Sequence, residues 1–581
     1  MVSQAIVPVN SKHAPQAKIL GVKDAIRRNS MARAADLAAD CLAGLGFDRL
    51  FCVPGESYLA LLDALHGRTD IDLVICRHEG GAGMMAVADA KLTGKPGLAA
   101  VSRGPGAANA SVAVHAAQQD AVPLVLLVGQ VARHERHLGA FQEVDYTQFF
   151  GSMAKGVWEV DDASRLPETL ARAYQVAMSG TPGPVVISLP EDMLEDRTEA
   201  TPLAAPAIAR SAPAGADMDR AADLIAKAER PLIIAGGGCA SPEGRRALAR
   251  AAEALGAPVA LTFKFQHIFD NASPLYGGHL GFKIPKAQVE ELQKADLILA
   301  VGTRLGDTPT QNYTLPRAPV PDQTLIHVHA DPAVPGRVHH ATLPMVSDAA
   351  LFLTALADRN LPRPAARDAW TAGVNAVARK IADRQPQPRA DGVEFGHMVN
   401  ALAAAAPKGT ALAMDAGNFS GWIHCLWPWD GASDSVGAVG GAMGMGVPGA
   451  VAACLRRSDK RAIGFVGDGG ALMTGNELAT GIAAGAKPII VISNNGTYAT
   501  IRMHQERDYP GRVSGTDLVN PDFTAWGAAF GALAITVTTP EEAPAAAARA
   551  FAHDGAVVIE VKSSAEAISP FATITQLRGL K

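Results

Sequence analysis

Residues 462–497 read AIGFVGDGGALMTGNELATGIAAGAKPIIVISNNGT. Two apolar runs, 462–466 and 489–492, flank a helical pattern in this stretch. Buried strands that alternate with helices are typical of a parallel sheet with helices on both faces. The first run ends in Gly467-Asp468-Gly469 and the second leads into Asn494-Asn495. We therefore expect an acidic and an amide side chain at the carboxyl edge of this sheet, beside a helix N-terminus that attracts phosphate.

The same alternation continues through most of the chain from Met31 onward and predicts an α/β protein of three doubly wound parallel-sheet units. A chain of 581 residues is also too long for a single core. The expected strands are residues 50–53, 73–76, 98–102, 124–128 and 185–189 in the first unit, 232–235, 259–262, 297–301 and 325–328 in the second, and 411–414, 462–466, 489–492 and 557–561 in the third.

The expected organisation has five parts. They are an N-terminal extension at 1–30, a first unit at 31–197, a linker at 198–215, a middle unit at 216–365 and a third unit at 385–570. The linker is expected because its Pro- and Ala-rich sequence has little to pack with. The middle unit is expected to fade into a polar, Pro-containing segment at 361–388. The first and third units share the same α/β plan.

The composition excludes several classes of protein. With 48% hydrophobic residues, 19% charged residues and a formal net charge of −5, the chain resembles neither a disordered nor a nucleic-acid-binding protein. Its six cysteines form no CxxC pair, which favours buried free thiols in a reducing compartment. No signal-type segment and no apolar run of about 18 residues is evident. The sequence therefore predicts a cytoplasmic protein without a membrane span.

The third unit contains candidate metal ligands. Mg²⁺ prefers hard oxygen ligands and is commonly shared between a carboxylate and a diphosphate, and Asp468 and Asn495 supply such oxygens. Taken singly, each motif is a common strand-terminating turn, since Gly, Asp and Asn dominate turns. Together, at this spacing, they resemble the GDG and NN motifs of thiamine-diphosphate enzymes. That resemblance implies Mg²⁺ bound by the side chains of Asp468 and Asn495 and the carbonyl of Thr497, and a diphosphate near Gly467, Gly469, Gly470 and Tyr498.

A lone acid follows the expected strand 73–76, in His78-Glu79 with small residues after it. On its own it is equally explained as a surface acid at a helix N-terminus. The segment resembles the HE-x-x-A motif of the same family, which implies that Glu79 hydrogen-bonds the cofactor pyrimidine. Such a carboxylate should be desolvated, because burial raises its pKa. Glu79 and Asp468 lie in different units, so the resemblance implies that they meet across a dimer interface, in a homodimer or a dimer of dimers.

The resemblance extends from about Met31 to Ile568 and is closest to the catalytic subunit of acetolactate synthase. It implies further cofactor contacts from Pro54, Asn109, Asn418, Phe419, Gly441 and Met443. Met443 would force the two cofactor rings into a V, whereas a plain packing role is the alternative for a methionine. The chain departs from that branch at Asn418-Phe419-Ser420, where Gln-His-Gln is usual, and at His504, which replaces a Trp that selects the second keto acid. Substrate choice therefore stays open.

The polar residues expected to handle the substrate are Gln142, His115, His504 and Arg103, and a structural role is the alternative for each. The resemblance implies an enzyme that decarboxylates a 2-oxo acid and transfers the acyl unit to an aldehyde or a second 2-oxo acid. A flavin-dependent oxidase resembling pyruvate oxidase and a decarboxylase resembling oxalyl-CoA decarboxylase are alternatives. Gly236-Gly237-Gly238 and 302–307 resemble a flavin-binding region, which leaves open FAD, another nucleotide or a vestigial site.

Overall fold

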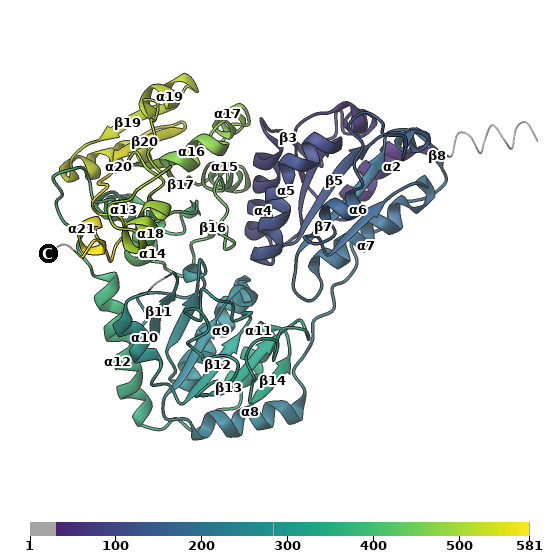
Figure 1. Ribbon diagram of the computed structural model, residues 1–581. Helices are drawn as coiled ribbons and strands as arrows, with labels where there is room; N and C mark the ends of the chain where they lie inside the picture. Colours follow the sequence, from purple (N-terminus) through teal and green to yellow (C-terminus); the bar gives the residue numbers. More distant parts are fainter. Residues whose placement is uncertain (1–30, 283, 580–581) are drawn as a thin grey trace, which may run out of the picture.

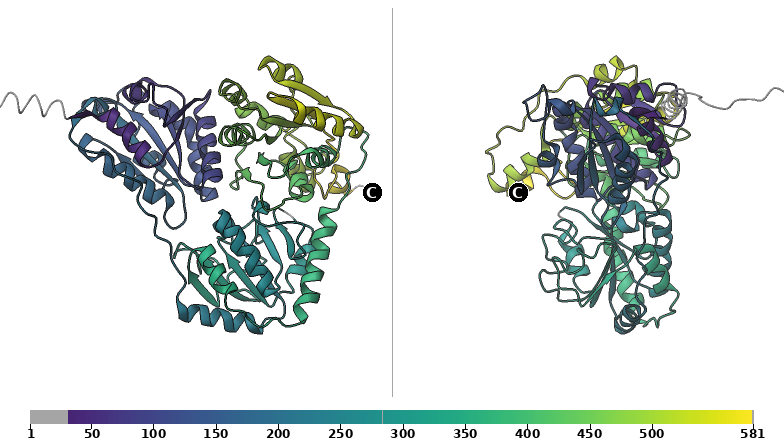
Figure 2. Two further views of the ribbon diagram at one scale, coloured as in Figure 1. Left: turned by 180° about the vertical axis from the view of Figure 1, so that it is seen from behind. Right: turned by 90° about the vertical axis from the view of Figure 1, so that its right-hand side faces the viewer.

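The computed structural model describes residues 31–282 and 284–579, so the expected extension at 1–30 lies outside the described residues. Three six-stranded parallel sheets, each flanked by helices, form three lobes (Figure 1). The predicted α/β class with three doubly wound sheets is confirmed. The first and third lobes lie side by side, and the middle lobe lies below both (Figure 2).

The first sheet has the strand order β3-β2-β4-β5-β7-β6. Its strands are β2 (Arg49–Cys52), β3 (Asp72–Ile75), β4 (Gly97–Ser102), β5 (Leu124–Gln130), β6 (Gly156–Glu159) and β7 (Pro184–Pro190). Its helices are α2 (Ala34–Gly44), α3 (Leu59–Ala64), α4 (Glu79–Thr93), α5 (Arg103–Asp120), α6 (Tyr146–Phe150) and α7 (Leu166–Met178). Two short strands, β1 (Ala32–Arg33) and β8 (Arg197–Thr198), pair antiparallel and close the unit.

The middle sheet has a different order, β11-β10-β9-β12-β13-β14, which is the order of dinucleotide-binding folds. Its strands are β9 (Pro231–Ala235), β10 (Val259–Thr262), β11 (Tyr276–Leu280), β12 (Leu297–Val301), β13 (Thr324–His329) and β14 (Leu343–Val346). Its helices are α8 (Gly215–Lys227), α9 (Pro242–Leu255), α10 (Lys286–Leu292), α11 (Ala349–Ala357) and α12 (Ala366–Ala382).

The third sheet has the order β16-β15-β17-β18-β20-β19. Its strands are β15 (Ala411–Met414), β16 (Ser435–Gly437), β17 (Ala462–Gly467), β18 (Ile489–Asn494), β19 (Leu533–Val537) and β20 (Val557–Lys562). Its helices are α13 (Gly396–Ala405), α14 (Ser420–Leu426), α15 (Gly446–Arg456), α16 (Asp468–Thr474), α17 (Glu477–Ala483), α18 (Ala499–Asp508), α19 (Phe523–Ala529), α20 (Ala543–Ala552) and α21 (Ile574–Leu577). Numbered along the chain, the first and third sheets both run 2-1-3-4-6-5, which confirms their shared plan.

The first and third units share one hydrophobic core. Helix α4 packs against α15, and buried residues of both belong to a single apolar cluster. All residues of α4 from Gly80 to Ala90 are buried, and the one charged residue among them, Asp89, accepts hydrogen bonds from Arg456 of α15 at 2.7 Å. Within the first unit a small residue lets α5 approach α4 closely, since a side chain on Gly83 would lie 2.5 Å from Cβ of Ala113. The two units therefore present their strand ends from a rigid common base.

The structure departs from the expectation of a polar segment at 361–388. This segment contains the 17-residue helix α12, which packs against β11 and α10. Trp370, Val374 and Ala378 are buried along one face of it, at helical spacing. Arg367 is fully buried and donates hydrogen bonds to the carbonyls of Ile225, Ala228 and Leu255. The polar composition of this segment therefore gave a wrong prediction, because the segment forms a helix of the middle unit.

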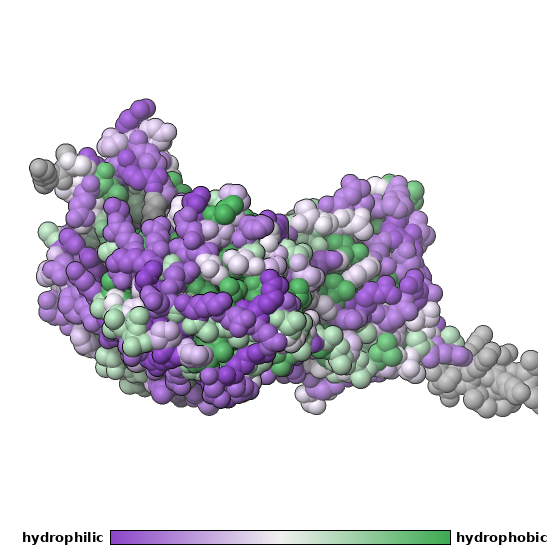
Figure 3. All heavy atoms as spheres, turned by 90° about the horizontal axis from the view of Figure 1, so that it is seen from below, coloured by the Kyte–Doolittle hydropathy of each residue, from purple (hydrophilic) through white to green (hydrophobic). Residues whose placement is uncertain are grey.

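Other features of the described chain agree with the sequence. All six cysteines are buried and unpaired, as expected for free thiols. Residues 199–214 form no helix or strand. Within the part that the structure describes, no helix combines the length and apolar character that a membrane crossing requires. Seen from below, the surface shows hydrophilic residues with apolar residues scattered among them (Figure 3).

Candidate functional site

Asp468 lies at the carboxyl edge of the third sheet, where β17 passes into α16. Its side chain is buried, and Oδ1 accepts a hydrogen bond from the backbone N–H of Gly469 at 2.9 Å. Oδ2 accepts from the N–H of Gly496 at 2.8 Å and from Nδ2 of Asn520 at 2.9 Å. Burial raises the pKa of Asp468, which these bonds partly oppose. The carboxylate is thus oriented by neutral donors, a setting in which a bound cation would stabilise its charge.

The amide turn after β18 lies beside this carboxylate. Oδ1 of Asn495 accepts from the N–H of Thr497 at 3.3 Å, and the Thr497 hydroxyl donates to the carbonyl of Thr516 at 2.9 Å. The ring of Tyr498 covers Gly469, where any side chain would clash with it. The structure therefore brings together Asp468, Asn495, Thr497, Tyr498 and the glycines of 467–470.

A second loop, residues 415–420, faces the same turn. The N–H of Asn418 donates to Oγ1 of Thr500 at 3.1 Å, and the Thr500 hydroxyl lies 3.1 Å from Oδ1 of Asn418. The ring of Phe419 lies over Gly467, 3.3 Å from the place of a Cβ there. Asn418 and Phe419 thus join the cluster at the start of α18, as expected for residues near one ligand.

Asp415 is the first residue of this loop and is fully buried. Its Oδ1 accepts from the N–H of Met445 at 2.7 Å, whereas Oδ2 has no hydrogen-bond partner. Burial raises the pKa of Asp415 to about 6. A side chain on Gly470 would clash with Oδ2 and would lie 3.8 Å from Cε of Met443. Met443 is therefore at the same site, half-buried, and Gly441 opens the preceding turn with φ +75°.

These observations fit a diphosphate with a divalent cation. Gly469 and Gly470 add no side chains of their own at the N-terminus of α16, where Tyr498 and Asp415 lie close, and backbone N–H groups at a helix N-terminus attract phosphate. Asp468, Asn495 and the Thr497 carbonyl offer only oxygen ligands, the kind that Mg²⁺ prefers. Among the described residues, no group of three His, Cys, Asp or Glu side chains forms an alternative metal cluster. The donor set thus suits a cation that is shared with a phosphate ligand.

Glu79 is the first residue of α4, in the first unit, and it is half-buried, so the expected desolvation is not found in the single chain. Its Oε2 accepts a hydrogen bond from Nδ2 of Asn109 at 2.9 Å, so α5 orients the carboxylate. Gln142 is half-buried with φ +65°, and its carbonyl accepts from the N–H of Gly104 at 3.0 Å. Glu79, Asn109 and Gln142 are thus grouped around α5. Among the described residues, no hydrogen bond or ion pair joins Glu79 to Asp468, Asn495 or Thr497.

The remaining candidates are more dispersed. Pro54 is exposed after β2, and His115 is exposed on α5. His504 is half-buried on α18. Arg103 is buried and ion-paired with Glu191 at 2.5 Å and Glu56 at 3.2 Å, which supports the structural alternative for this residue.

Three polar residues at these sites were not predicted. Asn520 bonds both Asp468 and Oδ1 of Asn494 at 2.9 Å, Asp415 lies beneath Gly470, and Glu477 reaches the segment before Glu79. Asp415 directly follows an expected strand, which is a usable signal. Asn520 lies in a segment without regular structure, where no sequence pattern marks it.

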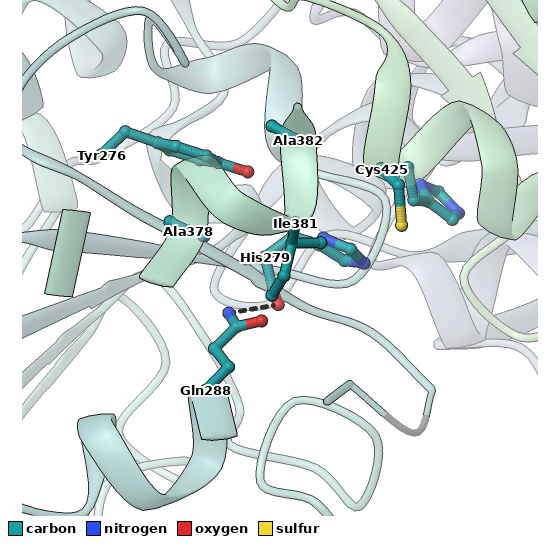
Figure 4. A pocket seen from close by; sticks show the side chains of 9 residues that line it. Tyr276, His279, Gln288, Ala378, Ile381, Ala382 and Cys425 are labelled. Carbon is teal, nitrogen blue, oxygen red and sulfur yellow. Dashed lines mark hydrogen bonds between the residues drawn. The ribbon is translucent and has the colours of Figure 1, made fainter. Parts of the chain in front are cut away.

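The glycine-rich turn of the middle unit has little space for a ligand. Side chains on Gly236 or Gly238 would lie 2.7–2.8 Å from Gly302. Close packing between the loops after β9 and β12 thus accounts for these glycines. A cavity of about 10 Å³, the size of about one water molecule, lies between α12, β11 and α14 and is lined by Tyr276, His279, His424 and Cys425 (Figure 4). It is far too small for a cofactor.

Comparison with known proteins gives matches over all three units. Residues 32–149 match the N-terminal TPP binding domain of the thiamine pyrophosphate enzymes, residues 218–356 match their central domain, and residues 415–561 match their C-terminal TPP binding domain. Glu79 and Asn109 lie in the first match, and the cluster around Asp468 lies in the third.

Curated relatives of similar length are also found. The acetolactate synthase large subunit of Parasynechococcus marenigrum is 31% identical over 90% of this chain and 86% of its own length. That of Corynebacterium glutamicum is 30% identical over 89% and 85%. The acetolactate synthase isozyme 2 large subunit of Escherichia coli is 28% identical over 91% and 95%.

Proposed function

The chain belongs to the thiamine pyrophosphate enzyme family, and we propose that it uses thiamine diphosphate and Mg²⁺ to decarboxylate a 2-oxo acid and join the acyl unit to an aldehyde or a second 2-oxo acid. Relatives that are acetolactate synthase large subunits support this reaction class. The observation that carries the proposal is the buried Asp468 carboxylate, oriented by neutral donors at the N-terminus of α16.

The third unit would hold the cofactor by its diphosphate. Asp468, Asn495 and the carbonyl of Thr497 are the proposed Mg²⁺ ligands, and backbone N–H groups at the start of α16 would donate hydrogen bonds to the phosphate. Asn418, Phe419, Gly441, Met443 and Tyr498 would line the same ligand. When bound, the cofactor supplies a stabilised carbanion equivalent at the carbonyl carbon of the donor.

The first unit would supply the proton-handling group. Glu79 would hydrogen-bond the pyrimidine ring, and Asn109 would keep its Oε2 in place. Glu79 is half-buried in the single chain, and its carboxylate would interact more strongly with the ring once a partner chain excludes water, because the local dielectric constant is then low. Gln142, His115 and His504 are proposed to contact the substrate.

We propose that two chains complete the site, with Glu79 of one chain acting at Asp468 of the other. Apolar side chains near Gln142 in the first unit and near Asp468 in the third unit are exposed to solvent in the single chain. They are Leu138 and Phe141 before Gln142, and Leu472 and Met473 in α16, each 46% to 77% exposed. Exposed apolar groups of this kind mark interaction surfaces. The domain limit 31–197 and a cytoplasmic location belong to the same proposal, whereas the expected limits 216–365 and 385–570 are extended by α12 in the middle unit and by α21 in the third.

A flavin is the second cofactor to test. The strand order of the middle sheet is that of dinucleotide-binding folds, and the Gly236–238 turn lies near its switch point, between β9 and β12. We expect purified protein to show a flavin absorbance band if FAD is retained. Oxygen consumption with pyruvate would then distinguish an oxidase from a synthase that retains its flavin.

The direct test is titration of the full chain with thiamine diphosphate and MgCl₂ in the presence of a panel of 2-oxo acids. We expect CO₂ release that depends on both additions, together with an acyloin or 2-hydroxy-2-oxo acid product. CO₂ release with simple protonation to an aldehyde would identify a decarboxylase. Absence of CO₂ release from every 2-oxo acid by cofactor-loaded protein would refute the proposal.

A further inference from the structure

Glu477 reaches from the third unit into the first. It is the first residue of α17 and is fully buried. Its Oε1 accepts from the N–H of His78 at 2.9 Å and from the N–H of Arg77 at 3.1 Å. Its Oε2 lies 3.1 Å from the same Arg77 nitrogen and accepts from the hydroxyl of Thr480 at 2.6 Å. One carboxylate thus binds the two backbone amides that directly precede Glu79.

The receiving segment is shaped for this contact. His78 caps α4, with its Nδ1 accepting from the N–H of Gly80 at 3.0 Å. A side chain on Gly81 would clash with Oε1 of Glu477, so glycine allows the carboxylate to approach. Figures 1 and 2 show α17 beside the β3 end of the first unit. The entrance to α4, and with it the position of Glu79, therefore depends on a residue of another unit.

Burial makes this contact strong. Desolvation raises the pKa of Glu477, and the hydrogen bonds from Thr480, Arg77 and His78 oppose that rise. Hydrogen bonds to an ionised group contribute more than neutral ones, and removing one partner inside a buried network leaves the others unsatisfied. Glu477 also follows Asp468 closely in the chain, because α16 leads into α17, so one short segment contains both residues.

We propose that Glu477 is a positioning residue that sets the place of Glu79 through the amides of Arg77 and His78. The inference rests on the proposed function, in which Glu79 is the proton-handling group. Glu477 contacts neither substrate nor cofactor in this account. Because Glu79 would serve the partner chain, the contact also ties each chain's own Asp468 loop to the carboxylate that it presents to the neighbouring site.

Hydrogen–deuterium exchange of the full chain without cofactor tests the contact independently of activity. In Glu477→Gln, we expect exchange in the peptide that contains Arg77 and His78 to become at least about 10-fold faster, since a charge-assisted acceptor is lost. Glu394→Gln is the matched control, because Glu394 is also fully buried in the third unit but binds Arg389. It should leave exchange at Arg77 and His78 unchanged. Unchanged exchange in Glu477→Gln would overturn the inference.

Turnover then tests whether the contact acts through Glu79. We expect Glu477→Gln to lower kcat by about 10-fold, within the range of a misplaced catalytic group, with a smaller change in KM. In a Glu79→Gln background the same substitution should lower kcat by less than about 2-fold, because effects in one network are not additive. A further 10-fold loss in that background would show a general structural role and contradict the proposal.

Two other variants keep the test decisive if Glu477→Gln does not fold. Gly81→Ala pushes the carboxylate away without removing it, and Thr480→Val removes one hydroxyl donor. Both should accelerate exchange at Arg77 and His78, Gly81→Ala more than Thr480→Val. Wild-type protein that releases no CO₂ from any 2-oxo acid would refute the proposed function, whereas the exchange data would still decide whether Glu477 holds this segment.

Discussion

The first and third units each have a sheet with the same strand order, but they carry opposite charges at matching positions. Strands β4 and β17 occupy the same place in the two strand orders, and each passes directly into a helix. In the first unit that helix opens with Arg103, whereas in the third it opens with Asp468. The strand order therefore does not decide which ligand each unit binds, since the side chains at the strand ends differ.

The partners of these two residues differ as well. Arg103 is neutralised within its own unit by Glu191 and Glu56. The partners of Asp468 are two backbone amides and Asn520, none of them charged. The charge of Arg103 is thus neutralised by side chains of its own unit, whereas the charge of Asp468 is left for a cation to neutralise. Glu79 stands after the edge strand β3, where the third unit has the glycine-rich turn after β16.

Removing the charge of the third unit should have the largest effect. Asp468→Asn keeps the size of the side chain but removes the carboxylate, so we expect Mg²⁺ affinity in the presence of thiamine diphosphate to fall by more than about 100-fold, because losing an outer-shell partner alone costs about 10–100-fold. Titration calorimetry measures this change. Asp522→Asn, which alters only the cap of α19, is the control. Wild-type Mg²⁺ affinity in Asp468→Asn would remove Asp468 from the site.

Removing the acid of the first unit should act on turnover and not on binding. We expect Glu79→Ala to fold normally, to retain Mg²⁺ and cofactor binding, and to lower kcat by about 100-fold or more, the scale of a positioned proton-transfer group. Glu168→Ala, at an exposed position on α7, is the control. Steady-state kinetics and cofactor titration on both variants separate the two effects. Near-wild-type turnover would exclude Glu79 from the mechanism.

The sequence predicted central strands better than edge strands. All thirteen expected strands are present, with ends shifted by at most a few residues. The unpredicted strands of the three large sheets are β6, β11, β14, β16 and β19, and each lies at a sheet edge. Central strands are buried on both faces and form continuous apolar runs. Edge strands are shorter or half-exposed, as in β14 with its alternating burial, or contain glycine, as in β11.

The residues of the candidate site were also predicted only in part. Asp468, Asn495 and Glu79 were predicted because each follows an expected strand in a segment that resembles a motif of the family. Glu477 was missed because one helical pattern was expected between the strands 462–466 and 489–492, whereas the structure has α16 and α17 with a break at Gly475-Asn476. That break directs Glu477 toward the first unit. Its role depends on a contact between units, and no local periodicity encodes such a contact.

A third prediction concerns the matching positions after the first strand of each unit. Here the third unit buries Asp415, and the first has Val53. Burial raises the pKa of Asp415 from the ordinary 3.8 to about 6 in the folded chain. Between these values the folded state keeps a proton that the unfolded state has lost, so stability falls as pH rises through this window. The free energy of unfolding of Asp415→Asn should not show this pH dependence. Its difference from wild type should therefore become up to about 3 kcal/mol more favourable for the variant above pH 6.

Thermal unfolding of the cofactor-free protein at pH 4 and pH 7 measures this difference. The melting temperature of Asp415→Asn, relative to wild type, should be higher at pH 7 than at pH 4. Val53→Ala, at the matching place of the first unit, should shift the melting temperature equally at both values. An equal shift for Asp415→Asn at both pH values would mean that Asp415 does not titrate in this range.

The smallest effect is expected at Arg103, the counterpart of Asp468. Arg103→Gln removes a buried guanidinium from two glutamates, of which Glu56 is largely exposed, so solvent screening limits the loss to about 1 kcal/mol. We expect a melting temperature a few degrees lower and unchanged Mg²⁺ and cofactor affinity. A raised KM for the 2-oxo acid without loss of stability would instead make Arg103 a substrate-binding residue. Arg103 and Asp468 would then both bind a ligand at the end of a strand. They would differ only in the ligand, since Arg103 would bind the 2-oxo acid and Asp468 the metal ion.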